Sequence, residues 1–208
     1  MADVTIDADK LDWRKGDGLL PAVVQHWRGG AVLMLGYMNP EALAQTQQSG
    51  KVTFWSRSRQ RLWTKGETSG NYLLFKAAFV DCDGDALVIH AEPQGPTCHL
   101  GTASCFGDAS APALAFLAEL DALVARRERE RPAGSYTTRL FESGVRRIAQ
   151  KVGEEGVETA LAAVAQDKEA LVGESADLLF HLLVLLRSGD ASLSDVAATL
   201  AERHKPRE

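Results

Sequence analysis

The spacing of apolar residues differs between the two halves of this 208-residue chain, and a short segment of small residues at 107–113 separates the halves. Before this segment, apolar and polar residues alternate with a period of two, which is typical of β-strands. After it, apolar residues recur about every 3.6 positions, which is typical of amphipathic helices. The segment itself, Gly-Asp-Ala-Ser-Ala-Pro-Ala, is typical of a linker. The sequence therefore predicts an α+β protein with a mainly β domain at 1–108 and an all-α helical bundle at 113–208.

Turn and cap signals divide both predicted domains into short elements. Gly29-Gly30 predicts a hairpin turn, and Asn39-Pro40 predicts the capped start of a helix that ends near Gly50. The expected strands are 19–27, 31–37, 52–63 (with a hairpin turn near 58–60), 75–80 and 86–91. The expected helices of the second domain are 114–124, 138–166, 168–187 and a last one that Ser192 caps and that runs towards Arg203.

All three cysteines lie close together in the sequence, at Cys82, Cys98 and Cys105. Thiolates are zinc ligands, and three of them leave the fourth position of the ion open for water, as in catalytic sites. Zinc lowers the pKa of such a water to about 7. The alternative is three buried, reduced thiols, since free cysteine is often buried. An odd number of cysteines argues against a disulfide framework, so we expect a reducing, cytoplasmic location.

Three aspartates surround Cys82, at Asp81, Asp83 and Asp85. Their oxygen atoms are ligands that magnesium prefers. If 72–83 formed one strand, Asp81 and Asp83 would share a face and Cys82 would point the other way. Cys82 and the aspartates would then bind different ions. Because the other two cysteines lie on a later Gly/Pro-rich loop, Cys82 is expected to meet them only across a subunit interface.

Basic and aromatic side chains alternate along 55–63, at Trp55, Arg57, Arg59, Arg61 and Trp63. On a straight strand they would share one face. Guanidinium groups bind phosphate, indole rings stack on bases, and the following loop at 66–70 adds hydroxyl and backbone donors. The alternative is an exposed edge strand that its charges keep soluble. We predict substrate contacts from Trp55, Arg57, Arg61, Lys65, Glu67 and Ser69.

Carboxylates interrupt the apolar stripes of two predicted helices. The stripe of 138–166, which includes Ile148 and Val152, reaches Glu155, with Glu158 one turn on. The helix at 168–187 repeats this pattern with Glu174 and Asp177. A carboxylate on a core stripe requires a partner, and paired carboxylates on facing helices are typical of metal-binding bundles. The four residues therefore predict a magnesium or manganese site; the alternative is acidic surface that has this spacing by accident.

Charge and hydropathy argue against a nucleic-acid-binding surface, a membrane-spanning segment and a signal peptide. The net charge of −5 argues against a general nucleic-acid-binding surface. The longest apolar run, 178–186, contains His181 and is too short to span a membrane. The start of the chain carries Asp3, Asp7 and Asp9 without an apolar stretch, which argues against a signal peptide.

Several motifs resemble known families. Met-Leu-Gly-Tyr-Met-Asn-Pro-Glu at 34–41 is similar to phosphoribosyl-AMP cyclohydrolase, as are the motifs at 62–71, 81–85 and 95–106. The segment 147–159, together with Glu-Ser-Ala-Asp-Leu at 174–178, resembles phosphoribosyl-ATP pyrophosphohydrolase, although other all-α nucleotide pyrophosphohydrolases share its acidic pattern. Together the two halves resemble the fused bifunctional enzymes of histidine biosynthesis.

This resemblance implies two hydrolyses. The C-terminal domain would cleave phosphoribosyl-ATP to phosphoribosyl-AMP and pyrophosphate, and the N-terminal domain would open the adenine ring at the N1–C6 bond. The three cysteines would hold zinc, drawn from both chains of a homodimer, and the three aspartates would hold magnesium near the substrate phosphates. His99 is the candidate general acid/base, although it could equally be structural, and Lys151 would neutralise phosphate charge.

Two other classes of protein share these features. One is a zinc-dependent purine deaminase fused to a nucleotide pyrophosphatase, which would release ammonia instead of only opening the ring. The other is a non-catalytic zinc-stabilised module whose helices serve dimerisation, and which would unfold when zinc is removed.

Overall fold

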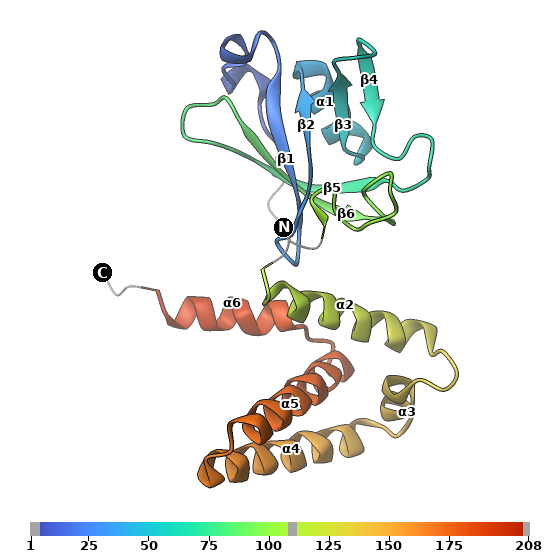
Figure 1. Cartoon of the computed structure of the whole chain (residues 1–208), viewed down its shortest axis with the longest axis vertical. Helices are drawn as coiled ribbons and strands as arrows, with labels where there is room; N and C mark the ends of the chain where they lie inside the picture. Colours follow the sequence, from blue (N-terminus) through green and yellow to red (C-terminus); the bar gives the residue numbers. More distant parts are fainter. Residues whose placement is uncertain (1–4, 108–111, 206–208) are drawn as a thin grey trace. The chain divides into compact units, whose positions relative to one another are not determined.

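The computed structural model describes residues 5–107 and 112–205 (Figure 1). The chain divides into two compact units, Met1–Phe116 and Leu117–Glu208. Within the described residues, every strand lies in the first unit and the second unit is helical, which confirms the predicted α+β class. Asp3 and the centre of the predicted linker, 108–111, lie outside the described residues.

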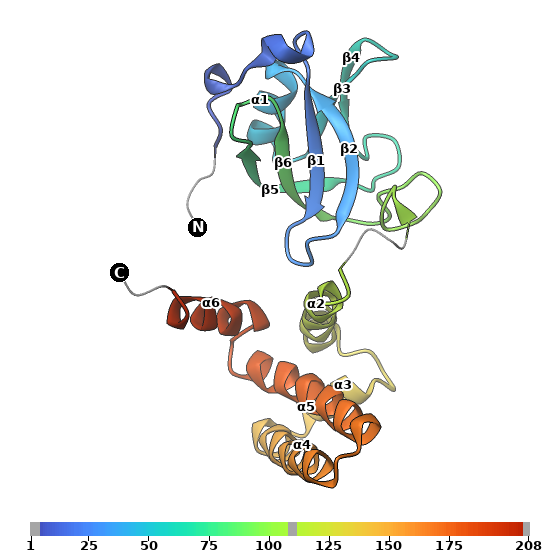
Figure 2. The ribbon, with the colours of Figure 1, turned by 60° about the vertical axis from the view of Figure 1, so that its left-hand side comes forward.

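The first unit is built on a four-stranded sheet with the strand order β2-β1-β6-β5. β1 pairs antiparallel with β2 and parallel with β6, and β5 pairs antiparallel with β6 (Figure 2). A separate hairpin consists of β3 and β4. The elements in chain order are the 3-10 helices η1 (Ala8–Lys10) and η2 (Trp13–Gly16), then β1 (Leu20–His26), β2 (Val32–Met38), α1 (Pro40–Ser49), β3 (Thr53–Ser56), β4 (Arg61–Thr64), β5 (Leu73–Val80) and β6 (Leu87–Pro93).

The core of this unit lies where the sheet, α1 and the hairpin meet. Leu20, Leu43 and Ile89 are fully buried there, as their apolar periodicity requires. Phe54 of β3 packs against Gly36 of β2 so closely that a methyl group at Gly36 would overlap its ring. A glycine at this position therefore lets the hairpin contact the sheet.

Helix α1 begins and ends where its caps predict. The side chain of Asn39 accepts a hydrogen bond from the Ala42 backbone N–H at 2.8 Å. Pro40 occupies the first turn, where its missing N–H has no cost. Gly50 ends the helix with a left-handed φ of 68°, a conformation that favours glycine.

The predicted strand at 75–80 is present as β5, whereas the alternation that one strand over 72–83 would give does not occur. β5 ends at Val80, and the aspartates lie in the turn that joins β5 to β6. The Asp81 carboxylate accepts hydrogen bonds from the backbone N–H groups of Asp85 and Ala86, at 2.9 and 3.1 Å, which closes this turn. Side chains therefore do not alternate between two faces along 81–83.

The predicted hairpin turn near 58–60 is confirmed, so the shared face that a straight strand over 55–63 would give does not form. The chain turns at residues 57–60, where Gln60 has a left-handed φ of 51°. Phe54 then pairs with Trp63, and Trp55 pairs with Leu62. Because paired residues lie on the same face of a hairpin, Trp55 and Trp63 point to opposite faces.

The second unit is a bundle in which α4 and α5 form the main helix pair (Figure 1). Val124, Leu140, Ile148, Leu183 and Val184 form its buried core. Its helices are α2 (Ala115–Glu130, which begins at the end of the first unit), α3 (Tyr136–Glu142), α4 (Val145–Ala165), α5 (Lys168–Ser188) and α6 (Leu193–Arg203). Across the described ranges, no helix has both the length and the apolar character needed to cross a membrane.

The predicted helix at 138–166 is two helices. α3 ends at Glu142 and α4 begins at Val145, because Gly144 between them has φ 81° and ψ 164°. Only glycine adopts this conformation readily. Val145, whose spacing from Ile148 would put it on the same core stripe in one continuous helix, is instead 54% exposed. The predicted cap Ser192 is present at the start of α6, where it forms a capping box with Asp195.

Candidate functional sites

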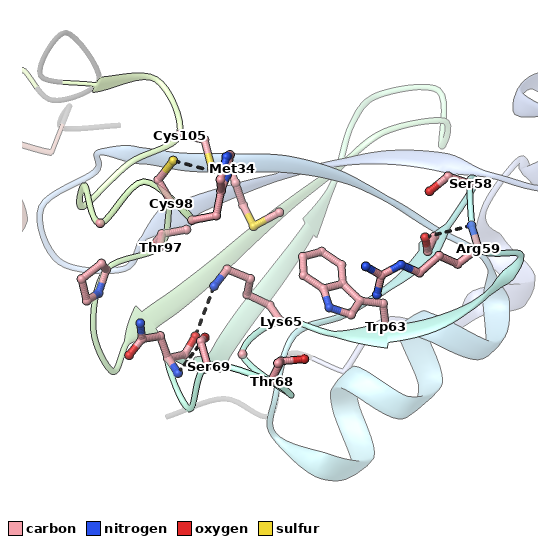
Figure 3. Close-up of a pocket in the computed structure, with 16 residues that line it drawn as sticks. Met34, Ser58, Arg59, Trp63, Lys65, Thr68, Ser69, Thr97, Cys98 and Cys105 are labelled. Atoms are coloured by element: carbon pink, nitrogen blue, oxygen red, sulfur yellow. Dashed lines mark hydrogen bonds between the residues drawn. The ribbon is translucent and has the colours of Figure 1, made fainter.

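A cavity of about 650 Å³ opens in the first unit (Figure 3). This volume falls in the range of small-molecule sites. The β3–β4 hairpin, the loop that follows β4 and the loop that follows β6 contribute most of its lining. The lining residues are Met34, Ser56, Ser58, Arg59, Trp63, Lys65, Gly66, Thr68, Ser69, Asn71, Pro96, Thr97, Cys98, His99, Gly101 and Cys105.

Two glycines hold the cavity loops in place. At Gly66, which has φ 90°, a Cβ atom would lie 2.5 Å from the Asn71 backbone. At Gly95 it would lie 2.5 Å from Asn71 Oδ1. Neither position tolerates a side chain without displacing Asn71. The loop after β4 therefore closes on itself and packs against the loop that carries Cys98.

Two of the three cysteines share a wall of the cavity. The Leu100 backbone N–H donates to Cys98 Sγ at 3.5 Å, which lowers the pKa of this buried thiol. Burial raises the pKa of the Cys105 thiol, and the nearby Cys98 adds to this rise. The Cys105 backbone N–H donates to Leu33 O at 2.8 Å, which holds its loop on β2. His99 lies beside them, with Nδ1 3.9 Å from Cys98 Sγ.

Cys82 lies elsewhere in the same chain. It is exposed in the β5–β6 turn and does not line the cavity. The whole of β6 separates this turn from the loop that carries Cys98 and Cys105. At about 3.3 Å per residue, this strand is roughly 20 Å long. One chain therefore brings two thiols together, not three.

Lys65 lies close enough to the two thiols for their charges to act on it. Only 8% of its surface is exposed, and its Nζ donates to Asn71 O at 3.3 Å. Burial lowers the pKa of Lys65, and the charges of the two cysteines oppose this shift. Its side chain lies between Trp63 and the segment of Thr97 and Cys98 (Figure 3). An anionic group in the cavity would therefore meet a poorly hydrated ammonium.

The predicted substrate contacts divide into two groups. Lys65 and Ser69 line the cavity, whereas Trp55, Arg57, Arg61 and Glu67 do not. The Arg57 guanidinium stacks 3.9 Å above the Tyr37 ring, and Arg61 pairs with Glu67 at 2.7 Å.

The cavity also contains residues that were not among the predicted substrate contacts. Arg59 and Trp63 lie on the alternating segment but were not selected as contacts. Thr97 is 2% exposed, and its Oγ1 finds no hydrogen-bond partner within residues 5–107 and 112–205. The only sequence signal for Thr97 was its place beside Cys98.

The acidic turn brings three carboxylates together. Oxygen atoms of Asp81, Asp83 and Asp85 all lie within 4.8 Å of one another. The Lys15 ammonium contacts two of them, 2.6 Å from Asp83 Oδ2 and 3.2 Å from Asp85 Oδ2. These oxygen donors suit magnesium, and the ammonium shows that a cation is attracted to this position.

A second carboxylate group lies between α4 and α5. Oxygen atoms of Glu155, Glu158 and Glu174 lie within 4.8 Å of one another. The fourth predicted ligand, Asp177, is exposed on α5 and lies outside this group of three. Burial raises the pKa of Glu158, and the charges of Glu155 and Glu174 push it in the same direction. A divalent cation would relieve this repulsion, so the three residues fit magnesium.

Lys151 balances part of this charge. Its Nζ lies 2.7 Å from Glu155 Oε1 and 3.0 Å from Glu154 Oε2. These contacts raise the pKa of Lys151 above its usual range and lower the pKa of Glu155. Glu155 is only 5% exposed, so this pairing allows its carboxylate to stay ionised inside the bundle.

The matches to known protein families divide the chain into the same two parts as the structure. Residues 34–107 match phosphoribosyl-AMP cyclohydrolase, and residues 117–204 match phosphoribosyl-ATP pyrophosphohydrolase. A protein of Xanthomonas axonopodis is 66% identical over 195 residues, which cover 94% of this chain and 93% of that protein. A protein of Escherichia coli is 58% identical over 196 residues, which cover 94% and 96%.

Both relatives are named histidine biosynthesis bifunctional protein HisIE. The two family matches follow each other in the same order as the two units of the structure. The chain therefore belongs to the bifunctional enzymes of histidine biosynthesis, in which a phosphoribosyl-AMP cyclohydrolase domain precedes a phosphoribosyl-ATP pyrophosphohydrolase domain.

Proposed function

We propose that the two sites carry out consecutive hydrolyses with different metals. The helical unit cleaves phosphoribosyl-ATP to phosphoribosyl-AMP and pyrophosphate. The first unit then hydrolyses the N1–C6 bond of the adenine ring of phosphoribosyl-AMP. The observation that carries the second assignment is that one cavity of the first unit is lined by two thiols, a buried lysine and an indole ring.

Zinc is the metal proposed for the cavity, held by Cys98, Cys105 and Cys82 of a second copy of the chain. Bound there, zinc supplies a Lewis acid for the attack on the adenine ring. Trp63 offers a surface on which a base can stack, and Lys65 and Ser69 offer donors for anionic or hydroxyl groups. His99 is exposed at the same wall, where it can accept or donate a proton.

A homodimer would bring the third cysteine to the cavity. Large apolar side chains are exposed within two sequence positions of each of the three cysteines: Val80, Leu100 and Phe106. Exposed apolar surface at these positions is typical of a subunit interface. Burying it between two copies would place the β5–β6 turn of one copy against the cavity of the other, in an arrangement with twofold symmetry.

Magnesium is the metal proposed for both carboxylate groups. In the helical unit, Glu155, Glu158 and Glu174 would hold it, with Asp177 as a further ligand one turn along α5. Bound there, magnesium neutralises the polyphosphate. Lys151 keeps Glu155 ionised and adds positive charge beside the group. In the first unit, Asp81, Asp83 and Asp85 would hold magnesium near the substrate phosphates.

Two substitutions test this division in the full-length protein. With phosphoribosyl-ATP as substrate, Cys98→Ala is expected to release pyrophosphate normally but to leave the ring closed, as measured by ultraviolet absorbance. Glu155→Ala is expected to abolish pyrophosphate release yet to open the ring of added phosphoribosyl-AMP. Pyrophosphate release that survives Glu155→Ala would refute the helical site.

The three free thiols also fit our proposal of a cytoplasmic protein.

A further inference from the structure

His181 of α5 is buried beside the carboxylate group of the helical unit. Only 4% of its surface is exposed, and it lies next to the core residues Leu183 and Val184. In the sequence it is the one polar residue of the apolar run 178–186. A buried imidazole requires hydrogen-bond partners for its ring nitrogens, so its surroundings show what it does.

Both ring nitrogens have partners, and these partners select one tautomer. Nδ1 lies 2.9 Å from the backbone oxygen of Asp177. A carbonyl oxygen only accepts, so Nδ1 carries the hydrogen. Nε2 lies 3.0 Å from the hydroxyl of Tyr136 on α3, which can donate to it. The neutral Nδ1–H imidazole therefore satisfies both contacts.

The same edge of the ring also lies near Glu155 on α4. Nδ1 lies 3.6 Å from Glu155 Oε1, the oxygen that also accepts from Lys151 at 2.7 Å. This separation is longer than a full hydrogen bond, but the N–H dipole still attracts the carboxylate in a poorly hydrated site. Two positive ends thus converge on one oxygen of Glu155.

We propose that His181 is a positioning residue for Glu155 in the pyrophosphohydrolase site. Lys151 and the Nδ1 edge of His181 border Oε1 and fix the orientation of the carboxylate, which would bind the divalent cation together with Glu158 and Glu174. Tyr136 fixes the tautomer and the orientation of the ring. This inference rests on the proposed metal site of the helical unit. Groups that orient metal ligands in this way contribute about 10- to 100-fold to metal affinity.

Two replacements of His181 test the contacts of its two ring nitrogens separately. In His181→Asn, the amide nitrogen takes the place of Nδ1, so an N–H near Glu155 is retained and the contact with Tyr136 is lost. In His181→Gln, the amide reaches the position of Nε2, so the contact with Tyr136 is retained and the N–H near Glu155 is lost. The comparison therefore tests which end of the ring matters.

The measurement is Mn²⁺ binding to the full-length protein, followed by electron paramagnetic resonance. The helical site is the component of binding that Glu155→Gln removes. His181→Gln is expected to weaken this component about 10-fold or more, whereas His181→Asn retains most of it. Equal losses in both variants, or no loss in either, would overturn the proposal. Persistence of all Mn²⁺ binding in Glu155→Gln would instead refute the metal site itself.

Phe180→Leu is the matched packing control. Phe180 precedes His181 on α5, and its ring contacts those of His181 and Tyr136 without any polar atom. The variant is expected to bind Mn²⁺ as the unsubstituted protein does. If it lost as much affinity as His181→Gln, aromatic packing would explain the effect and the positioning role would be wrong. The cyclohydrolase rate of each variant reports that the first unit is intact.

Discussion

Lys15 places its ammonium nitrogen 2.6 Å from Asp83 Oδ2, although 68 residues separate the two in the sequence. The contact joins the 3-10 helix η2 to the β5–β6 turn and puts a protein cation among the carboxylates proposed to bind magnesium. The carboxylates raise the pKa of Lys15 above its usual range, so the side chain stays charged at all physiological pH values.

Replacing Lys15 should therefore tighten magnesium binding at this turn. In Lys15→Gln, a magnesium ion no longer competes with the ammonium for Asp83 and Asp85. Because exposed ion pairs are weak, we expect a decrease of no more than several-fold in the Mg²⁺ concentration for half-maximal cyclohydrolase activity. Lys10→Gln is the control, since it removes the same charge from an exposed lysine nearby. Equal decreases in both variants would show a general charge effect and contradict direct competition.

Thr97→Val tests the unpaired hydroxyl in the cavity wall. Valine has nearly the same shape, so the variant only replaces the Oγ1 hydroxyl, which lacks a partner among the described residues, by a methyl group. If substrate supplies that partner, the variant should lose about 10-fold in cyclohydrolase kcat/KM, the equivalent of one hydrogen bond. The free energy of unfolding should stay the same or rise, because a buried polar atom is gone. Unchanged kcat/KM would mean that substrate does not reach this hydroxyl.

Lys65→Met should make the first unit more stable and less active. Burial lowers the pKa of Lys65 from its ordinary value of 10.5, so the unfolded chain binds the proton more tightly than the folded one. The resulting cost to stability is complete below the folded pKa and disappears as the pH rises through the ordinary value. Removing the charge should therefore raise the free energy of unfolding at neutral pH and lower the cyclohydrolase rate.

Urea unfolding at neutral and alkaline pH measures this effect. The gain in stability of Lys65→Met should shrink as the pH approaches 10.5, the ordinary value for lysine. Lys76→Met, which replaces an exposed lysine of β5 outside the cavity lining, should show neither the gain nor the loss of activity. A gain that does not depend on pH would point to packing of the methionine instead of relief of a buried charge.

Local signals in the sequence predicted the parts of the structure that depend on neighbouring residues. The cap at Asn39 fixed the start of α1, because its hydrogen bond spans only three residues. Glu155 and Glu158 lie one helical turn apart, so helix geometry alone puts them on one side of α4. The facing position of Glu174 followed from the apolar stripe of α5.

Features that depend on distant contacts were not predicted. The parallel pairing of β1 with β6 joins segments with most of the first unit between them, and no local pattern marks it. The contact of Lys15 with the acidic turn and the contact of His181 with Tyr136 also join distant segments, so no local pattern marks them. The break at Gly144 is local, but the apolar pattern continues across it, so periodicity alone favoured one helix.

Mixing two inactive variants tests whether the zinc site combines two chains. In a twofold dimer, each site would take Cys82 from one chain and Cys98 with Cys105 from the other. A mixed dimer of Cys82→Ala and Cys98→Ala then has one site that lacks both residues and one that lacks neither. Random pairing makes half of the dimers mixed, so refolding the two variants together should restore about one quarter of the cyclohydrolase activity.

The control pair is Cys98→Ala with Cys105→Ala. Both residues lie on the same wall of the cavity within one chain, so each site of a mixed dimer still lacks one cysteine. No activity should return, and zinc content should stay low in this mixture. Recovery with the control pair, or none with the first pair although both variants fold, would contradict a site shared between chains. The separation of Cys82 from the other cysteines by the length of β6 would then require a different third ligand.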